Sequence, residues 1–180
     1  MKLYGGTVTD FIDDSVHNRI AEKLKSAFFA NFRFQAGPSE VNSWRNSLRA
    51  ASQVFERAKL TDHGVMLEYQ IPMTSRRLDC IVTGRDDLLR DQAVIVELKQ
   101  WDKCEETDGE RIVTFVGGAH RDVLHPSVQV GQYRQYLQDC HTAFHEGADL
   151  PDLRPPTAAR PQNPPSAAGL TYGNPSGTAT

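Results

Sequence analysis

A carboxylate and an ammonium group follow one apolar segment of the chain closely. The sequence AVIVELKQW places Glu97 and Lys99 directly after the apolar residues 93–96, with one residue between them. Because side chains of a strand alternate between its two faces, Glu97 and Lys99 are predicted to share a face. Asp79 interrupts an earlier apolar segment, RLDCIVT, 18 positions before Glu97. If the two strands are neighbours, the two carboxylates converge at one edge of a sheet.

Two carboxylates held close together repel each other, and a hard divalent cation relieves that repulsion. Mg²⁺ suits such a site because it keeps waters and phosphate oxygens as its remaining ligands, and Mn²⁺ is a substitute. We therefore expect Asp79 and Glu97 to hold a metal that assists water attack on a phosphodiester, with Lys99 acting on the water or on the developing charge. The alternative is an ordinary surface ion pair where the strand reaches solvent, which is the commoner meaning of an isolated Glu-x-Lys.

Three further polar residues are candidates for the same site. Gln129 and Tyr133 are four residues apart on a predicted helix, so they share one helix face. We expect Gln129 to orient the catalytic groups and Tyr133 to contact nucleic acid. Glu68, on the first predicted strand, is either a third acidic metal ligand, a residue that positions water, or a side chain that faces solvent.

Two arginines, Arg76 and Arg77, precede Asp79 and can grip a phosphate, although charged residues are common where strands begin.

Positive charge is concentrated near the start of the chain. Residues 19–60 carry eight Lys or Arg against three Glu, a net charge of +5, whereas residues 61–110 carry twelve acids against six bases, a net of −6. This division suits a backbone-binding face beside a cation site, and it suits ordinary solvated faces equally well.

The elements that must position these residues can be read from hydrophobic spacing. One amphipathic helix is predicted from an N-cap at Asp10 to about Phe32, and a second after a cap at Ser39. Strands are predicted over residues 64–69, 77–83 and 93–99, with a shorter strand at 111–116 and a last helix over 127–146. This order predicts an α/β fold, with a small mixed β-sheet flanked by α-helices.

The residues Asp79…Glu97-Leu98-Lys99 resemble the catalytic signature of the PD-(D/E)XK nuclease superfamily. The resemblance implies a restriction-endonuclease-like core, Mg²⁺ held by the Asp and the Glu, and a Lys that assists the attacking water. The sequence QVGQY at 129–133 is similar to the QxxxY motif on the helix that follows the catalytic strand in exonuclease-type members. The proline of the superfamily's name has no counterpart beside Asp79.

A narrower resemblance covers residues 1–148. The segments SEVNSWRNSL, LEYQIPMTSRRLDCIVTG, AVIVELKQW and GGAHRDVLHPSVQVGQY are similar to the N-terminal region of large bacterial Schlafen-like DNA/RNA helicases. There a nuclease-like module precedes a P-loop helicase, but no GxxxxGK[ST] occurs here, so we expect no ATPase activity. The resemblance implies a helicase-associated endonuclease acting on DNA or RNA, with the helicase either lost or present as a partner, and it leaves a homodimer open. The alternative is a catalytically inactive module that binds nucleic acid or recruits a partner.

Composition sets the boundaries of the predicted domain. Residues 149–180 hold seven of the ten prolines and few large apolar side chains, so we expect a disordered tail after a domain of residues 1–148. The three cysteines form no disulfide framework, which favours a reducing cytoplasm. We expect no signal peptide, because the first residues turn acidic at once, and no membrane span, because no apolar run is long enough.

Overall fold

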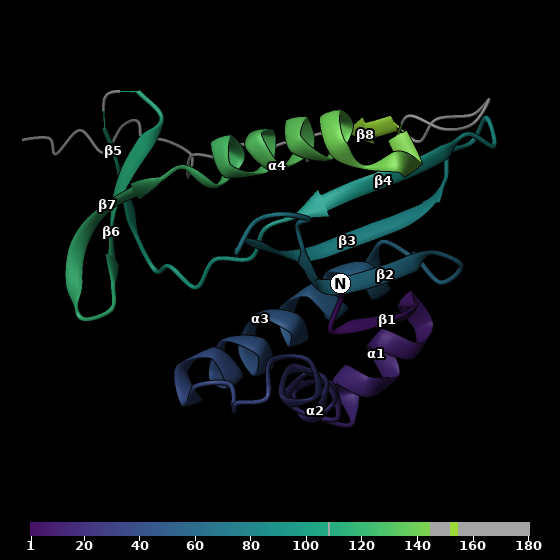
Figure 1. Cartoon of the computed structure of the whole chain (residues 1–180), viewed down its shortest axis with the longest axis horizontal. Coiled ribbons are helices and arrows are strands. Elements are labelled where there is room, and N and C mark those ends of the chain that lie inside the picture. Colours follow the sequence, from purple (N-terminus) through teal and green to yellow (C-terminus); the bar gives the residue numbers. More distant parts are fainter. Residues whose placement is uncertain (108, 145–151, 155–180) are drawn as a thin grey trace, which may run out of the picture.

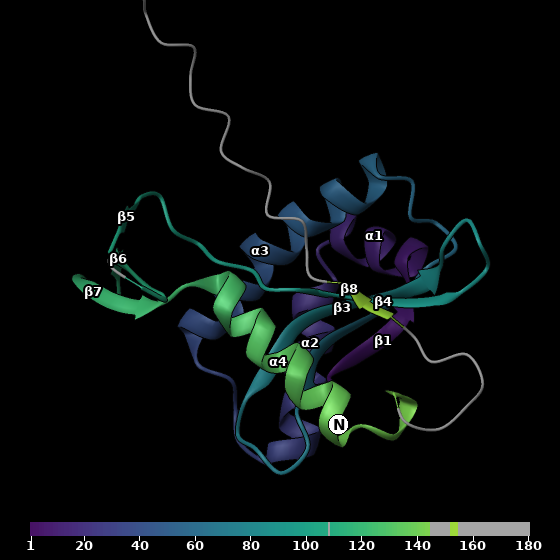
Figure 2. The same ribbon diagram turned by 90° about the horizontal axis from the view of Figure 1, so that it is seen from above.

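Three helices in the first sixty residues form one layer of the protein. The computed structural model describes residues 1–107, 109–144 and 152–154. The helices are α1 (Val8–Val16), α2 (Ile20–Phe32) and α3 (Pro38–Arg57), and they lie together on one side of the main sheet (Figures 1 and 2). None of the helices in the described part of the chain has both the length and the apolar character that crossing a bilayer requires.

The single helix predicted up to Phe32 is two helices. Thr7, not Asp10, caps the first one, and Asp10 completes a capping box by accepting from the Thr7 backbone. The helix ends near Asn18, whose φ of 55° is left-handed, and α2 begins at Ile20 in a new direction. Arg19 fixes this corner, because its side chain and backbone N–H both bond Asp14.

The main sheet has five strands in the order β1-β2-β3-β4-β8. They are β1 (Tyr4–Thr7), β2 (Gly64–Gln70), β3 (Arg77–Arg85), β4 (Asp91–Val96) and β8 (Asp152–Arg154). The first four pair antiparallel, and β8 pairs with β4 in parallel. The predicted α/β class with a small mixed sheet flanked by helices is therefore confirmed at this level.

Helix α4 (Pro126–Cys140) covers the face of the sheet opposite α1–α3 (Figures 1 and 2). Its buried residues, Val130, Tyr133 and Leu137, pack with Ile81, Ala93 and Ile95 in a second core cluster. The first core cluster, between the sheet and α1–α3, includes Val65, Leu67, Cys80 and Val82. The helix ends at Cys140 and a short 3-10 turn follows at Thr142–Phe144, so the helix predicted to about Glu146 was too long. Residues 145 and 146 lie outside the described ones.

A separate three-stranded antiparallel sheet joins β4 to α4. It consists of β5 (Cys104–Glu106), β6 (Arg111–Val116) and β7 (Ala119–Leu124), and it stands apart from the main sheet (Figure 1). The hairpin between β6 and β7 turns at Gly117 and Gly118, whose φ values of 61° and 82° suit glycine. Only β6 was expected from the sequence, since β5 has three residues and both β5 and β7 are mostly exposed.

Candidate active site

Two neighbouring strands change the face on which they bury side chains at Glu68 and Asp79. Leu67 belongs to the core under α1–α3, but Tyr69, two residues later, packs on the core under α4. Strict alternation would put both on one face. The left-handed φ of 51° at Glu68 accounts for the switch in β2. Glu68 and Asp79 therefore lie at the positions where the buried face of each strand changes from one core cluster to the other.

The strand register aligns three carboxylates across the sheet. Leu67 pairs with Cys80 and Tyr69 with Leu78, which puts Glu68 opposite Asp79. Cys80 also pairs with Val96, the last residue of β4, so Glu97 follows opposite Asp79 on the other side. Leu98 N–H donates to Asp79 Oδ2 at 2.8 Å and extends this contact beyond the end of β4. The structure thus brings Asp79 and Glu97 together, and Glu68 lies on β2, on the other side of Asp79.

Glu97 is the centre of a network that includes Lys99 and helix α4. Lys99 Nζ lies 2.7 Å from Glu97 Oε1, which also accepts from Gln129 Nε2. Gln129 Oε1 accepts from Lys99 Nζ at 3.2 Å, and its Nε2 donates to Tyr133 Oη at 2.7 Å. Lys99 and Gln129 therefore lie against Glu97, and Tyr133 reaches the network through Gln129. The Glu97 side chain is only 4% exposed.

One oxygen of this network has no partner. Within the described residues, Glu97 Oε2 is buried and accepts no hydrogen bond. Such an atom carries a desolvation cost that a bound cation would remove. Carboxylate oxygens are also the donor type that Mg²⁺ and Mn²⁺ prefer, so the residues fit a hard divalent ion.

The electrostatics of the two carboxylates agree with that cost. Burial raises the pKa of Glu97, and the nearby Asp79 charge raises it further, while Lys99 and Gln129 oppose the shift. Burial also raises the pKa of Asp79, against the opposing effects of the Leu98 N–H and Lys99. Both carboxyl groups therefore resist ionisation in the absence of a cation.

Glu68 belongs to a second network on the side of α3. Its Oε1 accepts from Trp44 Nε1 at 2.7 Å, and its Oε2 lies 3.1 Å from Arg77 Nη1. Arg77 also bonds Glu40 on α3, and its guanidinium lies 5.3 Å from the ring centroid of Phe28. Burial raises the pKa of Glu68 to about 7 despite these partners. Glu68 Oε1 thus accepts a hydrogen bond, while Oε2 faces the Arg77 guanidinium in an ion pair without one.

Two residues of α3, Glu40 and Trp44, join this network without a strong sign in the sequence. Trp44 is in the core, 4% exposed, as its position on the apolar face of α3 predicts. Its indole N–H nevertheless holds Glu68. The available signal was their spacing, since residues four apart on a helix share a face.

The two predicted phosphate-binding arginines differ in their surroundings. Arg77 is paired with two carboxylates, which offset its charge. Arg76 is exposed, and its Nη1 donates to Gln132 Oε1 on α4 at 3.4 Å. Arg76 is therefore the more accessible of the two for a phosphate.

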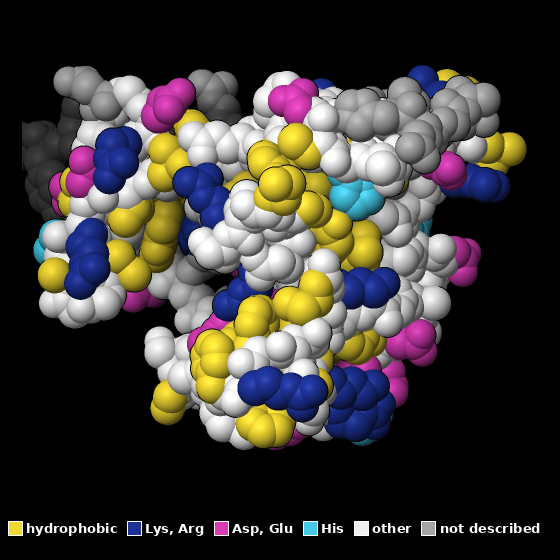
Figure 3. All heavy atoms as spheres, viewed as in Figure 1, with side chains coloured by type: hydrophobic (Ala, Val, Ile, Leu, Met, Phe, Trp, Pro, Cys, Tyr) yellow, Lys and Arg dark blue, Asp and Glu magenta, His cyan; other side chains and the backbone are white. Residues whose placement is uncertain are grey.

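The helical layer is less cationic than its sequence implies. Figure 3 shows Lys and Arg side chains over this layer, interleaved with apolar ones. Arg19 and Lys23 pair with Asp14, and Lys25 and Arg45 pair with Glu22. Much of the positive charge in residues 19–60 is thus matched locally.

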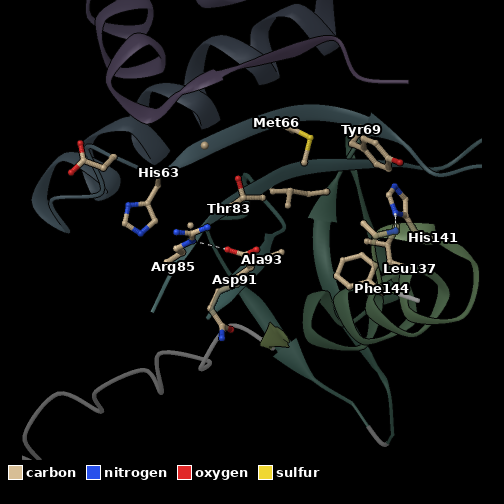
Figure 4. A pocket seen from close by; sticks show the side chains of 16 residues that line it. His63, Met66, Tyr69, Thr83, Arg85, Asp91, Ala93, Leu137, His141 and Phe144 are labelled. Atoms are coloured by element: carbon tan, nitrogen blue, oxygen red, sulfur yellow. Dashed lines mark hydrogen bonds and ion pairs between the residues drawn. The ribbon is translucent and has the colours of Figure 1, made fainter. Parts of the chain in front are cut away.

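Two cavities lie at different places on the sheet. One of about 600 Å³ is lined by Asp79, Glu68 and Arg77 together with residues of α3. Another, of about 760 Å³, lies between the sheet, α4 and the turn after it, and Figure 4 shows His63, Met66, Tyr69, Arg85 and Phe144 around it. The second cavity includes none of the predicted site residues.

Comparisons with known proteins do not assign the chain to a family. Across residues 1–107, 109–144 and 152–154, no three His, Cys, Asp or Glu side chains are arranged as a metal-binding group. No family model, curated protein or solved structure matches the chain. The resemblance to PD-(D/E)XK nucleases therefore depends on the residues of this chain alone.

Proposed function

We propose that this chain is a metal-dependent nuclease domain of PD-(D/E)XK type, which hydrolyses phosphodiester bonds in DNA or RNA. The observation that carries the proposal is the gathering of Asp79, Lys99 and Gln129 around Glu97, one of whose buried oxygens lacks a partner. An ordinary surface ion pair would not bury its carboxylate to 4% exposure beside a second carboxylate.

Each residue has a distinct part in this proposal. Asp79 and Glu97 hold Mg²⁺, or Mn²⁺ in its place, and the ion supplies a more acidic water and offsets phosphate charge. Lys99 holds the attacking water or stabilises the charge that develops on the phosphate. Gln129 orients Glu97 and Lys99 through hydrogen bonds to both. The hydroxyl of Tyr133, which accepts from Gln129, contacts the nucleic acid.

The surrounding residues contribute less directly. Glu68, whose oxygens already accept from Trp44 and face Arg77, positions a water for the metal and does not bind it directly. Arg76 contacts a phosphate of the substrate, and Arg77 maintains the acidic network beside it. The proposal includes a cytoplasmic location, which the free Cys80, Cys104 and Cys140 favour, and an association with a helicase or with a second copy of the chain.

A second candidate is a catalytically inactive module that binds nucleic acid or recruits a helicase-type partner. One observation favours it: Lys99 bonds Glu97 Oε1 at 2.7 Å and so supplies a positive charge where a metal would otherwise be needed. A carboxylate neutralised by a fixed ammonium group is stable without a cation. The two candidates differ in whether Mg²⁺ displaces that ammonium from Glu97.

A nuclease assay separates the two candidates. Supercoiled plasmid, single-stranded DNA and RNA are incubated with the chain in Mg²⁺, in Mn²⁺ and in EDTA. The proposal predicts metal-dependent cleavage that Asp79→Asn and Glu97→Gln abolish. Asp91→Asn is the matched control, because Asp91 is exposed at the other end of β4 and pairs only with Arg85 in the described residues. Binding without cleavage under all metal conditions, or equal cleavage by Asp79→Asn, would contradict the proposal.

A further inference from the structure

A tryptophan that has no part in the proposed chemistry lies next to Lys99. Trp101 is half-buried in the irregular segment between β4 and β5. Lys99 Nζ lies 5.7 Å from the centroid of its ring, within the range of a cation–π contact. Trp44, the other tryptophan of the chain, is buried and bound to Glu68. Trp101 is therefore the accessible indole, and it lies beside the proposed catalytic lysine.

Hydrogen bonds on either side of Lys99 hold this segment in place. Upstream, Leu98 N–H bonds Asp79. Downstream, Gln100 Nε2 donates to the Ser43 carbonyl at 3.0 Å and to Ser47 Oγ at 2.8 Å, both on α3. Because Gln100 is tied to α3 and Lys99 Nζ lies against the Trp101 ring, the indole stays on the side of Lys99. The indole is thus positioned before any ligand arrives, which lowers the entropy cost of binding.

The charges around Trp101 disfavour binding through phosphates alone. Asp102, Glu105 and Glu106 follow it on the linker and on β5, with Lys103 as the one base among residues 102–106. Tight binding to duplex DNA depends mainly on neutralising many phosphates, which this segment does not do. Stacking of a base on an aromatic ring needs no such charge and tolerates any sequence.

We propose that Trp101 is a stacking platform for a nucleobase adjacent to the phosphate held at Lys99, and that the site therefore takes single-stranded nucleic acid. In a duplex both faces of an internal base are covered by its neighbours, so an indole can stack only on an unpaired base or a strand end. This inference rests on the proposed function for the position of the phosphate, and it adds the substrate class.

Fluorescence of Trp101 tests the stacking without any cleavage. In the full chain carrying Trp44→Phe, Trp101 is the only tryptophan. Titration in EDTA with a single-stranded oligothymidylate is expected to quench its emission, whereas a relaxed, covalently closed circular duplex at equal nucleotide concentration quenches it much less. Equal quenching by both probes, or none by either, would overturn the inference.

Affinity measurements on chains that retain Trp44 give a second test. We expect Trp101→Ala and Trp101→Leu to weaken binding of the single strand by on the order of tenfold, and Trp101→Phe to retain most of it. The slope of affinity against salt should stay unchanged, because no charge is removed. Phe115→Ala is the matched control, since Phe115 is an exposed aromatic on β6 and should leave affinity unaltered. A Trp101→Ala protein that binds the single strand as tightly as the unaltered chain would contradict the stacking role.

An abasic scan identifies the stacked nucleotide and separates the two proposals. One abasic position, moved along the oligonucleotide, should weaken binding to the unaltered chain at one or two places and have no further effect in Trp101→Ala. Loss of single-strand binding in Trp101→Ala without cleavage by any form would keep the stacking inference and refute the nuclease. Cleavage at equal rates by the unaltered chain and Trp101→Ala, and of single and double strands alike, would keep the nuclease proposal and refute the stacking inference.

Discussion

Two acidic networks meet at Asp79, one on each side of it in the sheet. In the network of Glu97, Lys99 and Gln129, the carboxylate keeps one buried oxygen without a partner. In the network of Glu68, Arg77 and Trp44, both carboxylate oxygens face protein donors. Residue type alone would give Glu68 and Glu97 the same role. Their partners separate them, because Glu68 Oε2 already faces the Arg77 cation, whereas Glu97 Oε2 is buried without a partner and is open to a metal ion.

The largest expected effect comes from removing a carboxylate of the Glu97 network. Glu97→Gln and Asp79→Asn should reduce metal-dependent cleavage by at least about a thousandfold, as loss of a group that stabilises transition-state charge requires. The same variants should raise the free energy of unfolding without metal, since each removes a buried charge that repels another. Cleavage rates and urea denaturation in EDTA measure the two effects. A variant that loses both activity and metal-free stability would indicate a structural role instead.

The next largest effect tests whether Lys99 competes with the metal. Lys99→Met should lower cleavage by about a hundredfold or more and, at the same time, tighten Mn²⁺ binding, because the ammonium no longer occupies Glu97 Oε1. Titration calorimetry with Mn²⁺ measures the second effect. Weaker Mn²⁺ binding in Lys99→Met would show that the lysine supports the site and does not compete for it.

Gln129 links Lys99 to Glu97, so its removal should have a smaller effect than removal of either. Gln129→Ala is expected to lower cleavage by about ten- to a hundredfold, as is typical of groups that orient ligands. Gln135→Ala is the matched control, because Gln135 is an exposed glutamine of α4 that bonds Asp139, away from the Glu97 network and from Arg76. Steady-state rates of both variants, measured at saturating Mg²⁺, give the comparison. Equal losses in both would mean that α4 packing, and not this hydrogen bond, is responsible.

The Glu68 network should reveal itself through stability and pH. The folded-state pKa of Glu68 is about 7, above its ordinary value of 4.5. Protonated Glu68 therefore contributes stability that is fully present below pH 4.5 and is lost as the pH rises through 7. Gln does not titrate. Glu68→Gln should therefore gain stability relative to the unaltered chain between those pH values, by on the order of 2–3 kcal/mol above pH 7. Urea denaturation from pH 4 to 9 measures this difference, and a constant difference across that range would refute it.

The smallest expected effect separates the packing role of the Tyr133 ring from the hydrogen-bonding role of its hydroxyl. Its ring is buried in the core under α4, and its hydroxyl accepts from Gln129. Tyr133→Phe keeps the ring and should cost about 1 kcal/mol of stability. Cleavage should fall by less than about tenfold, because Gln129 retains its bond to Glu97. Thermal denaturation and rate measurements of this variant check both expectations. A loss as large as that of Gln129→Ala would give the hydroxyl a direct role.

The parts of the fold that follow from hydrophobic spacing could be predicted from the sequence. The apolar residues 93–96 gave a buried strand, and that strand delivers Glu97 beside Asp79. The strands that the sequence missed bury little: β1 contains two glycines and β5 is exposed throughout. β8 lies within the Pro/Gly-rich segment of residues 149–180, and all other residues of that segment lie outside the described ones.

The details that separate the two acidic networks depend on tertiary contacts. A left-handed backbone at Glu68 is unusual for a residue other than glycine, so local sequence gives no sign of it. The pairing of Arg77 with Glu40 joins residues 37 positions apart. The break between α1 and α2 has neither proline nor glycine, and the bonds from Arg19 to Asp14 hold it. Hydrophobic spacing predicts none of these features, because each depends on contacts or backbone angles outside the repeating pattern.

The central claim is a cation site between Asp79 and Glu97, and a crystal soaked in Mn²⁺ tests it most directly. An anomalous difference map at the manganese edge should contain a peak in contact with both carboxylates, including Glu97 Oε2. Lys99 should remain on the same face of the sheet with its ammonium withdrawn from Glu97. A map at saturating Mn²⁺ with no peak there, and with Lys99 still bonded to Glu97, would contradict the account.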